Sequence, residues 1–253
     1  MKQIFLTAAV LLLPMLCTTA GAAGVFLLRK TGEPATRRML CGMAAGIMLA
    51  ASVWSLLLPA IERAEQGPLP AWVPPAVGLL LGAVGLLRLE TLAGRLLNAG
   101  PGRCGRMVLA VTLHNLPEGM AVGVVLAGFL AGDPTITLAS VTALSVGIAI
   151  QNVPEGAIVS LPLATNGLSR PRAFLAGTLC GAVEPLGAAI MVAITGLVTP
   201  LLPVVLAFAA GAMMYVVTEE LIPQTQQGHH TNIGTIGVAF GFVLMMVLDV
   251  ALG

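Results

Sequence analysis

Residues 106–130 read RMVLAVTLHNLPEGMAVGVVLAGFL, an apolar run that carries a histidine, an asparagine and a glutamate near its middle. A bilayer core about 30 Å thick needs roughly 20 predominantly apolar residues per crossing helix, and this run is long enough. Ionisable side chains so deep in a membrane are costly and usually mark an ion or substrate pathway. The stretch therefore predicts a transmembrane helix with a polar site at its centre.

The rest of the chain has the same apolar character. Its 253 residues are 57% hydrophobic and 9% charged, with a mean hydropathy of +0.98, whereas a soluble domain carries about 25% charged residues. An ordinary soluble protein is therefore excluded. The net charge of +1 gives no reason to expect nucleic acid as a partner.

Apolar runs separated by charges, Pro or Gly predict eight transmembrane helices in one domain that covers residues 1–253. Because lipid-facing backbone must satisfy its own hydrogen bonds, and because the runs lack two-residue alternation, we expect an all-α polytopic membrane protein. The expected helices are 3–28, 39–61, 72–93, 106–130, 137–161, 172–197, 201–222 and 232–252. The first run could instead be a signal peptide, but its apolar character continues to Leu28, which favours a retained helix.

The basic residues predict the orientation, because Lys and Arg in short loops stay on the cytoplasmic side. Ten of the twelve fall on one side of the expected helices, namely Arg29, Lys30, Arg37, Arg38, Arg88, Arg95, Arg103, Arg106, Arg170 and Arg172. Lys2 and Arg63 fall on the other side. We therefore expect a multi-pass protein of the cell membrane with both termini on the extracytoplasmic side.

A six-residue pattern occurs twice, as HNLPEG at 114–119 and QNVPEG at 151–156. At about 100° per residue, Glu118 points roughly 40° away from His114 around the helix axis, and roughly 60° away from Asn115 in the opposite sense. Glu118 therefore lies between them on the helix surface. The second glutamate lies between its own glutamine and asparagine in the same way. If the two helices face each other, both glutamates lie at the centre with one group of candidate ligands on each side, which is a layout for two adjacent cations.

A third intramembrane acid, Glu184, lies on the sixth expected helix, roughly 20 Å from its cytoplasmic start. One buried glutamate could be packing between helices, but three acids with a repeated motif favour a site. From the residues alone, the candidate ligands are His114, Asn115, Glu118, Gln151, Asn152, Glu155 and Glu184.

Prolines accompany all three acids, at 117, 154 and 185. Each lacks an N–H and frees the carbonyl four residues earlier. We therefore expect proline-broken helices 4, 5 and 6 around a metal site at the membrane midplane. The freed carbonyls could bind a cation, its water, or a neighbouring Ser or Thr.

The four cysteines, Cys17, Cys41, Cys104 and Cys180, lie in different segments without a CxxC pair. Their spacing favours neither a thiolate zinc site nor a disulfide framework. We expect them to be small buried thiols.

These residues resemble the ZIP (Zrt/Irt-like protein) family of divalent metal transporters, in its prokaryotic form. The resemblance spans the whole chain and rests on the two motifs, on Glu184-Pro185, on the stretch from Met48 to Ser55 and on Glu219-Glu220-Leu221-Ile222-Pro223. The family's eight-helix topology with both termini outside agrees with the one derived from charge.

The resemblance implies a homodimer that carries metal toward the cytoplasm through a binuclear site between helices 4 and 5. It implies that the first metal takes His114, Glu118, Gln151 and Glu155, with Met48 nearby, and that the second takes Asn115, Glu118, Asn152, Glu155 and Glu184. Taken alone, Met48 would be core filler. The resemblance also implies that helices 1, 4, 5 and 6 move against helices 2, 3, 7 and 8.

The chain departs from the family pattern at two places. Many members have His where Gln151 stands, so the first site has a weaker ligand here, and many have a His-rich loop where residues 94–105 contain no His. His229 and His230 follow the seventh helix and could bind departing metal near Glu219, although a solvated loop explains them nearly as well.

Zn(II) is the expected substrate, with Cd(II), Fe(II) and Mn(II) as competitors, because mixed imidazole, amide and carboxylate ligands suit borderline cations. No resident cofactor is expected. An intramembrane metalloenzyme or protease would need HExxH, paired aspartates or Gly-x-Ser-x-Gly, and the aspartates are only Asp133 and Asp249. We therefore expect no enzyme, whereas a metal receptor without transport stays an alternative.

Overall fold

The computed structural model describes residues 2–27, 34–96, 103–195, 201–226 and 231–252, and these residues form helices without a β-strand. In chain order the elements are α1 (Lys2–Ala22), α2 (Gly24–Leu27), α3 (Pro34–Ala51), η1 (Ser52–Leu57), α4 (Leu58–Ala64), α5 (Val73–Leu96), α6 (Arg103–Leu130), α7 (Leu138–Thr165), α8 (Arg170–Gly181), α9 (Val183–Thr195), α10 (Leu202–Val216), η3 (Val217–Leu221), α11 (Ile222–Thr225) and α12 (Ile233–Leu252). The label η marks π-helix.

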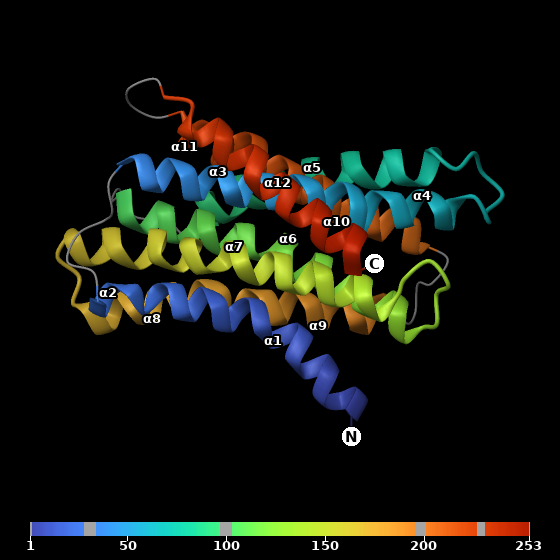
Figure 1. The fold of residues 1–253 in the computed structure, drawn as a ribbon, viewed down its shortest axis with the longest axis horizontal. Helices are drawn as coiled ribbons and strands as arrows, with labels where there is room; N and C mark the ends of the chain where they lie inside the picture. Colours follow the sequence, from blue (N-terminus) through green and yellow to red (C-terminus); the bar gives the residue numbers. More distant parts are fainter. Residues whose placement is uncertain (1, 28–33, 97–102, 196–200, 227–230, 253) are drawn as a thin grey trace.

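Within the described residues, eight helical stretches are long and apolar enough to cross a membrane. This confirms the predicted all-α fold with eight spans. The stretches run roughly side by side along the long axis of the molecule, and α1 begins toward the end at which α12 ends (Figure 1). Predicted and observed bounds agree to within a few residues. The fifth span is longer than predicted because the helix accommodates Pro162 and continues to Thr165.

The predicted breaks at proline are not found in α6 and α7, which run without interruption through Pro117 and Pro154. A proline removes one N–H from the hydrogen-bond ladder, and in these helices the remaining bonds keep the helix continuous. The sixth span does have an interruption, at Ala182, three residues before Pro185. There the N–H of Ala182 is shared between two carbonyls of α8.

Two other spans contain π-helix where the sequence predicts regular α-helix. η1 and η3 lie just before Pro59 and Pro223, respectively. π-helical segments are rare and frequently lie at functional sites. η3 carries Glu220, which faces the centre of the bundle in the site described below.

Close backbone contacts at glycines join the helices in pairs. A Cβ added at Gly21 or Gly156 would collide with backbone across the α1–α7 crossing, and one at Gly119 would collide with the backbone of α9. The α3–α12 and α5–α10 pairs have the same kind of contact, at Gly46 and Gly82. Small residues allow membrane helices to approach closely enough for dispersion to hold them together.

We divide the helices into two sets, following the division that the family resemblance implies. In the first set, α1 with α6 to α9, Thr18 donates a hydrogen bond to Glu184. In the second set, α3 to α5 and α10 to α12 with η1 and η3, Ser55 donates to Asp249. Where the sets meet, Gly147 of α7 faces the side chain of Met245 of α12. At the described glycines, the close contacts with backbone thus lie within a set, whereas Gly147 meets a side chain across the junction.

Two glycines on α5 give a direct test of the backbone contacts. A Cβ at Gly82 would collide with the carbonyl oxygen of Phe208, whereas one at Gly85 would lie an ordinary 3.4 Å from the Phe208 ring. We expect Gly82→Ala to lower the free energy of unfolding by about 1–3 kcal/mol through overpacking, and Gly85→Ala to change it by less than about 0.5 kcal/mol. Unfolding in mixed detergent micelles measures both, and equal stability of the two variants would contradict the packing account.

Candidate metal centre

The structure places all eight predicted site residues inside the bundle. They are Met48 on α3, His114, Asn115 and Glu118 on α6, Gln151, Asn152 and Glu155 on α7, and Glu184 on α9. Seven of them are buried, and Glu155 is half-buried. Because buried polar groups need partners in a low-dielectric interior, their contacts indicate which of them are free to bind a ligand.

A cavity of about 40 Å³ lies between α3, α6, α7 and η3. Its walls include Met48, His114, Glu118, Glu155 and Glu220. A void of this size can hold a few water molecules, since one water needs roughly 10–15 Å³ by the same kind of measure. It can therefore also hold a divalent cation with part of its hydration shell.

Glu118 has one carboxylate oxygen engaged and one free. Gln151 Nε2 donates to its Oε1 at 2.6 Å, and Oε2 is buried without a hydrogen-bond partner. The residue is 1% exposed, and leaving a charged acceptor unpaired in such a position costs several kcal/mol. A cation in the cavity would supply the missing partner.

Glu184 belongs to a second group on the other face of the α6–α7 pair. Thr18 Oγ1 donates to its Oε1 and Asn152 Nδ2 donates to its Oε2, both at 2.9 Å. Asn152 Oδ1 and both polar atoms of the Asn115 amide are buried without partners. This group therefore combines one carboxylate with neutral oxygen donors that the protein leaves free.

Glycine after each motif glutamate explains why these side chains come together. A Cβ at Gly119 would collide with the backbone of Glu184, and one at Gly156 would collide with the backbone of Thr18. The two glycines therefore let α9 and α1 touch the motif helices at the level of the acids. The Thr18–Glu184 hydrogen bond lies between these two contacts.

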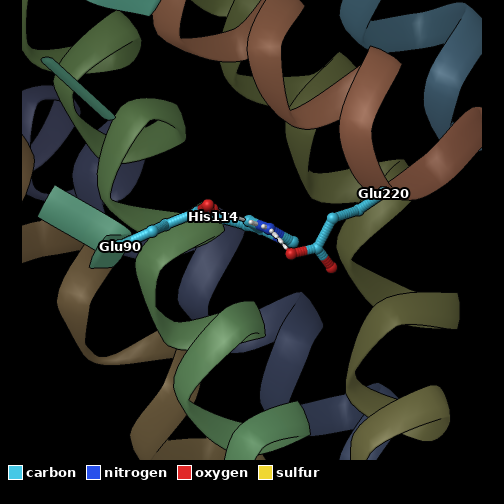
Figure 2. A group of neighbouring side chains, drawn as sticks. All are labelled: Glu90, His114 and Glu220. Atoms are coloured by element: carbon cyan, nitrogen blue, oxygen red, sulfur yellow. Dashed lines mark ion pairs between the residues drawn. The ribbon is translucent and has the colours of Figure 1, made fainter. Parts of the chain in front are cut away.

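His114 faces the second helix set. Its Nε2 lies 2.8 Å from Glu220 Oε1 on η3 and 3.8 Å from Glu90 Oε1 on α5, and the three side chains converge (Figure 2). Tyr215 donates from its OH to Glu90 Oε2 at 2.9 Å. Among the described residues, this is the group of three His, Cys, Asp or Glu side chains whose ligand atoms all lie within 4.8 Å of one another. It has the composition of a site for one divalent cation.

The structure brings only some of the residues of the two predicted ligand sets close to one another. His114, Glu118 and Glu155 line one cavity, yet the imidazole pairs with Glu220 and not with the motif glutamates. The two ligand sets therefore stay predictions. His229 and His230, considered above as ligands for departing metal, lie outside the described residues.

Sequence reasoning missed two acids of the site. Glu90 was not among the candidate ligands, yet its side chain is only 22% exposed and accepts a hydrogen bond from Tyr215. The only tyrosine of an otherwise apolar chain could have indicated a polar partner inside the bundle. Glu220 was part of the Glu219–Pro223 stretch, but nothing in its spacing relates it to His114.

Known proteins match this chain over the regions that build the site. The family described as ZIP Zinc transporter matches residues 105–249. Zinc transporter ZIPB of Bordetella bronchiseptica is 43% identical, over 86% of this chain and 72% of its own. Zinc transporter GufA of Myxococcus xanthus is 38% identical, over 79% and 81%, and Zinc transporter ZIP11 of Xenopus tropicalis is 35% identical, over 93% and 94%.

The family match covers more than half of the chain and includes both motifs, Glu184 and Glu220. The relatives extend the similarity to most of the remaining helices. With eight apolar helices in the described residues, the chain is a multi-pass membrane protein. It belongs to the ZIP family of zinc transporters.

Proposed function

We propose that this chain imports Zn(II) into the cytoplasm through a binuclear site between α6 and α7, and that it does so as a homodimer. The observation that carries the proposal is the cavity lined by Met48, His114, Glu118 and Glu155. Into it faces a carboxylate, Glu118, with an oxygen that no protein group satisfies. The names of the relatives, all zinc transporters, support zinc as the substrate.

The two groups of donors support two cations. In the proposal, the first takes His114, Glu118, Gln151 and Glu155 beside Met48, and the second takes Asn115, Glu118, Asn152, Glu155 and Glu184. Imidazole and carboxylate bind Zn(II), Fe(II), Mn(II) and Cd(II), whereas amides bind more weakly. A transported ion must be able to leave its site, so weak neutral ligands suit conduction better than a closed thiolate site would.

The Glu90–His114–Glu220 group supports a release step. His114 lines the cavity beside Glu118, and its Nε2 already lies 2.8 Å from Glu220. In the proposal, a cation that leaves Glu118 is next bound by Glu220 and Glu90 on the second helix set. Several weak sites in sequence keep a cation moving where one tight site would retain it.

Packing supports movement of the first helix set against the second. Close backbone contacts at glycine occur within the sets, whereas Gly147 meets the Met245 side chain across the junction. Polar links across the junction include Arg63 Nε to Asp133 Oδ2 at 3.0 Å and the ion pair of His114 with Glu220. Side-chain contacts of this kind can be exchanged by sliding of packed helices.

The basic residues support the proposed orientation of the chain in the membrane. Arg37 and Arg38 lie in the first turns of α3, and Arg170 and Arg172 begin α8. These helix ends lie at the end of the bundle opposite to α4 (Figure 1), which carries Arg63. By the positive-inside rule, the end with α8 is cytoplasmic and both termini are extracytoplasmic.

Accumulation of radioactive zinc tests the proposal and its direction. Intact cells that express the chain should take up more zinc than control cells, and purified protein in liposomes should conduct zinc. Glu118→Gln should reduce both by at least about tenfold, because it removes a charged ligand shared by two cations. Glu62→Gln, at an exposed position on α4, is the matched control and should behave like the wild type. If cells that express the chain lose zinc, the proposed direction of transport is wrong and the chain exports zinc. If the protein in liposomes conducts no zinc, the chain is a metal receptor and not a transporter.

A substitution at Glu184 tests whether the two proposed sites share Glu118 and Glu155. Glu184 serves one cation in the proposal and both its oxygens are held by Thr18 and Asn152. Glu184→Gln should therefore leave measurable zinc flux under conditions in which Glu118→Gln and Glu155→Gln leave none. The same liposome assay with equal amounts of folded protein compares the three variants, and equal loss from all of them would refute the shared role of Glu118 and Glu155.

Gln151→His tests the position at which this chain departs from many family members. The amide donates to Glu118, and an imidazole there would bind Zn(II) more strongly than a neutral amide does. We expect a lower KM for zinc, a lower maximal rate because the ion leaves more slowly, and weaker competition by Mn(II). Zinc uptake with and without Mn(II) measures this, and an unchanged preference would remove Gln151 from the ligands.

A further inference from the structure

Cys41 lies on the wall of the same cavity as the motif acids, although its sequence position gives no sign of a metal ligand. It is 1% exposed and lines the cavity together with Ala44 and Met48. Residues 41, 44 and 48 share one face of α3, because they are three and seven positions apart. The cavity wall formed by α3 thus carries one sulfur atom at each end, roughly 10 Å apart along the helix axis.

The Cys41 thiol is available to a ligand. Its hydrogen bond is weak and goes to Gln224 Oε1, 3.6 Å away on α11. Gln224 lines the cavity, and its Oε1 also accepts a long hydrogen bond from Arg37 Nη2 at 3.5 Å, so a cation bound here would displace the guanidinium. Glu220, one turn before Gln224, lines the cavity as well. A thiol, an amide oxygen and a carboxylate therefore face one small space at the end of the cavity nearer to the start of α3.

A second observation points to a cation in the same cavity. The cavity-lining Glu118 is 1% exposed and its Oε2 has no hydrogen-bond partner. The cavity therefore holds an unpaired buried acceptor at one position and a nearly free thiol at another. Both are groups that a divalent cation would satisfy.

We propose that Cys41 Sγ is a ligand for soft divalent cations, above all Cd(II), at the release end of the pathway, with Gln224 and Glu220 as its companions. The proposal rests on the function proposed above and makes Cys41 a residue that determines metal selectivity. As the metal–sulfur bond forms, the thiol gives its proton to water. Soft thiolate selects soft cations, whereas imidazole, amide and carboxylate alone do not.

The consequence is that cadmium leaves more slowly than zinc. Zn(II) is borderline and exchanges readily among oxygen and nitrogen donors, but a softer cation gains more from the thiolate and stays at Cys41. Cadmium should therefore block zinc uptake at low concentration. The block should depend on one cysteine of the four.

Two cysteine variants test this assignment. In the first, Cys17, Cys104 and Cys180 are replaced by Ser and Cys41 is kept; in the second, only Cys41 is replaced, by Ser. Addition of Cd(II) to purified protein should produce the ultraviolet charge-transfer band of a cadmium thiolate in the wild type and in the first variant, but not in the second. In liposomes, the cadmium concentration that halves zinc uptake should rise at least about tenfold in Cys41→Ser, which corresponds to 1.4 kcal/mol of binding, and stay unchanged in the first variant.

Several results would overturn the assignment. The first is a cadmium thiolate band that persists in Cys41→Ser. The second is the absence of this band from the variant that keeps only Cys41. The third is equal inhibition of zinc uptake by cadmium in all three proteins. Because the first variant keeps Cys41, it decides the question even where Cys41→Ser folds poorly. The band is measured without transport, so a wild type that binds cadmium in this way but conducts no zinc would refute the proposed function and leave the thiol site standing.

Discussion

Helix backbones approach one another most closely where the side chains between them are smallest, and the glycines that follow the two motif glutamates allow such an approach at the level of the acids. Gly119 lies against the backbone of Glu184 and Gly156 lies against that of Thr18. These contacts bring four helices around Glu118, Glu155 and Glu184, and Thr18 and Asn152 each donate a hydrogen bond to Glu184. Without such an approach, the buried Glu184 would lose the hydrogen bond from Thr18 that offsets part of its desolvation. Glu118 keeps one oxygen unpaired, which favours the proposed binding site over a purely structural role.

Much of this arrangement could be predicted, because a membrane leaves few solutions for an apolar chain. Length and hydropathy give the eight spans, and the repeated motif predicts which helix faces meet. Tertiary contacts that no local pattern encodes could not be predicted. Glu90 meets His114 because α5 and α6 approach, and Glu220 faces it from a π-helical segment. The effect of proline was overestimated, since α6 and α7 stay continuous through Pro117 and Pro154.

His114 connects the two helix sets. It lies on the first helix set, within the motif, but its imidazole pairs with an acid of the second set. Cys41 and Gln224 lie on the second set and extend the same cavity. The acids proposed to bind the metal and the groups proposed for its release therefore lie on different sets, which supports a mechanism in which the sets shift as metal passes between them. Backbone contacts within each set would keep its own geometry during such a shift.

Anomalous diffraction from crystals of the zinc-bound protein tests the central claim most directly. The account predicts two zinc peaks between α6 and α7, about 4 Å apart as in other two-metal sites. Glu118 and Glu155 would lie between them, with His114 and Gln151 at one peak and Asn115, Asn152 and Glu184 at the other. A single peak between these helices, or zinc bound only at Glu90, His114 and Glu220, would contradict it.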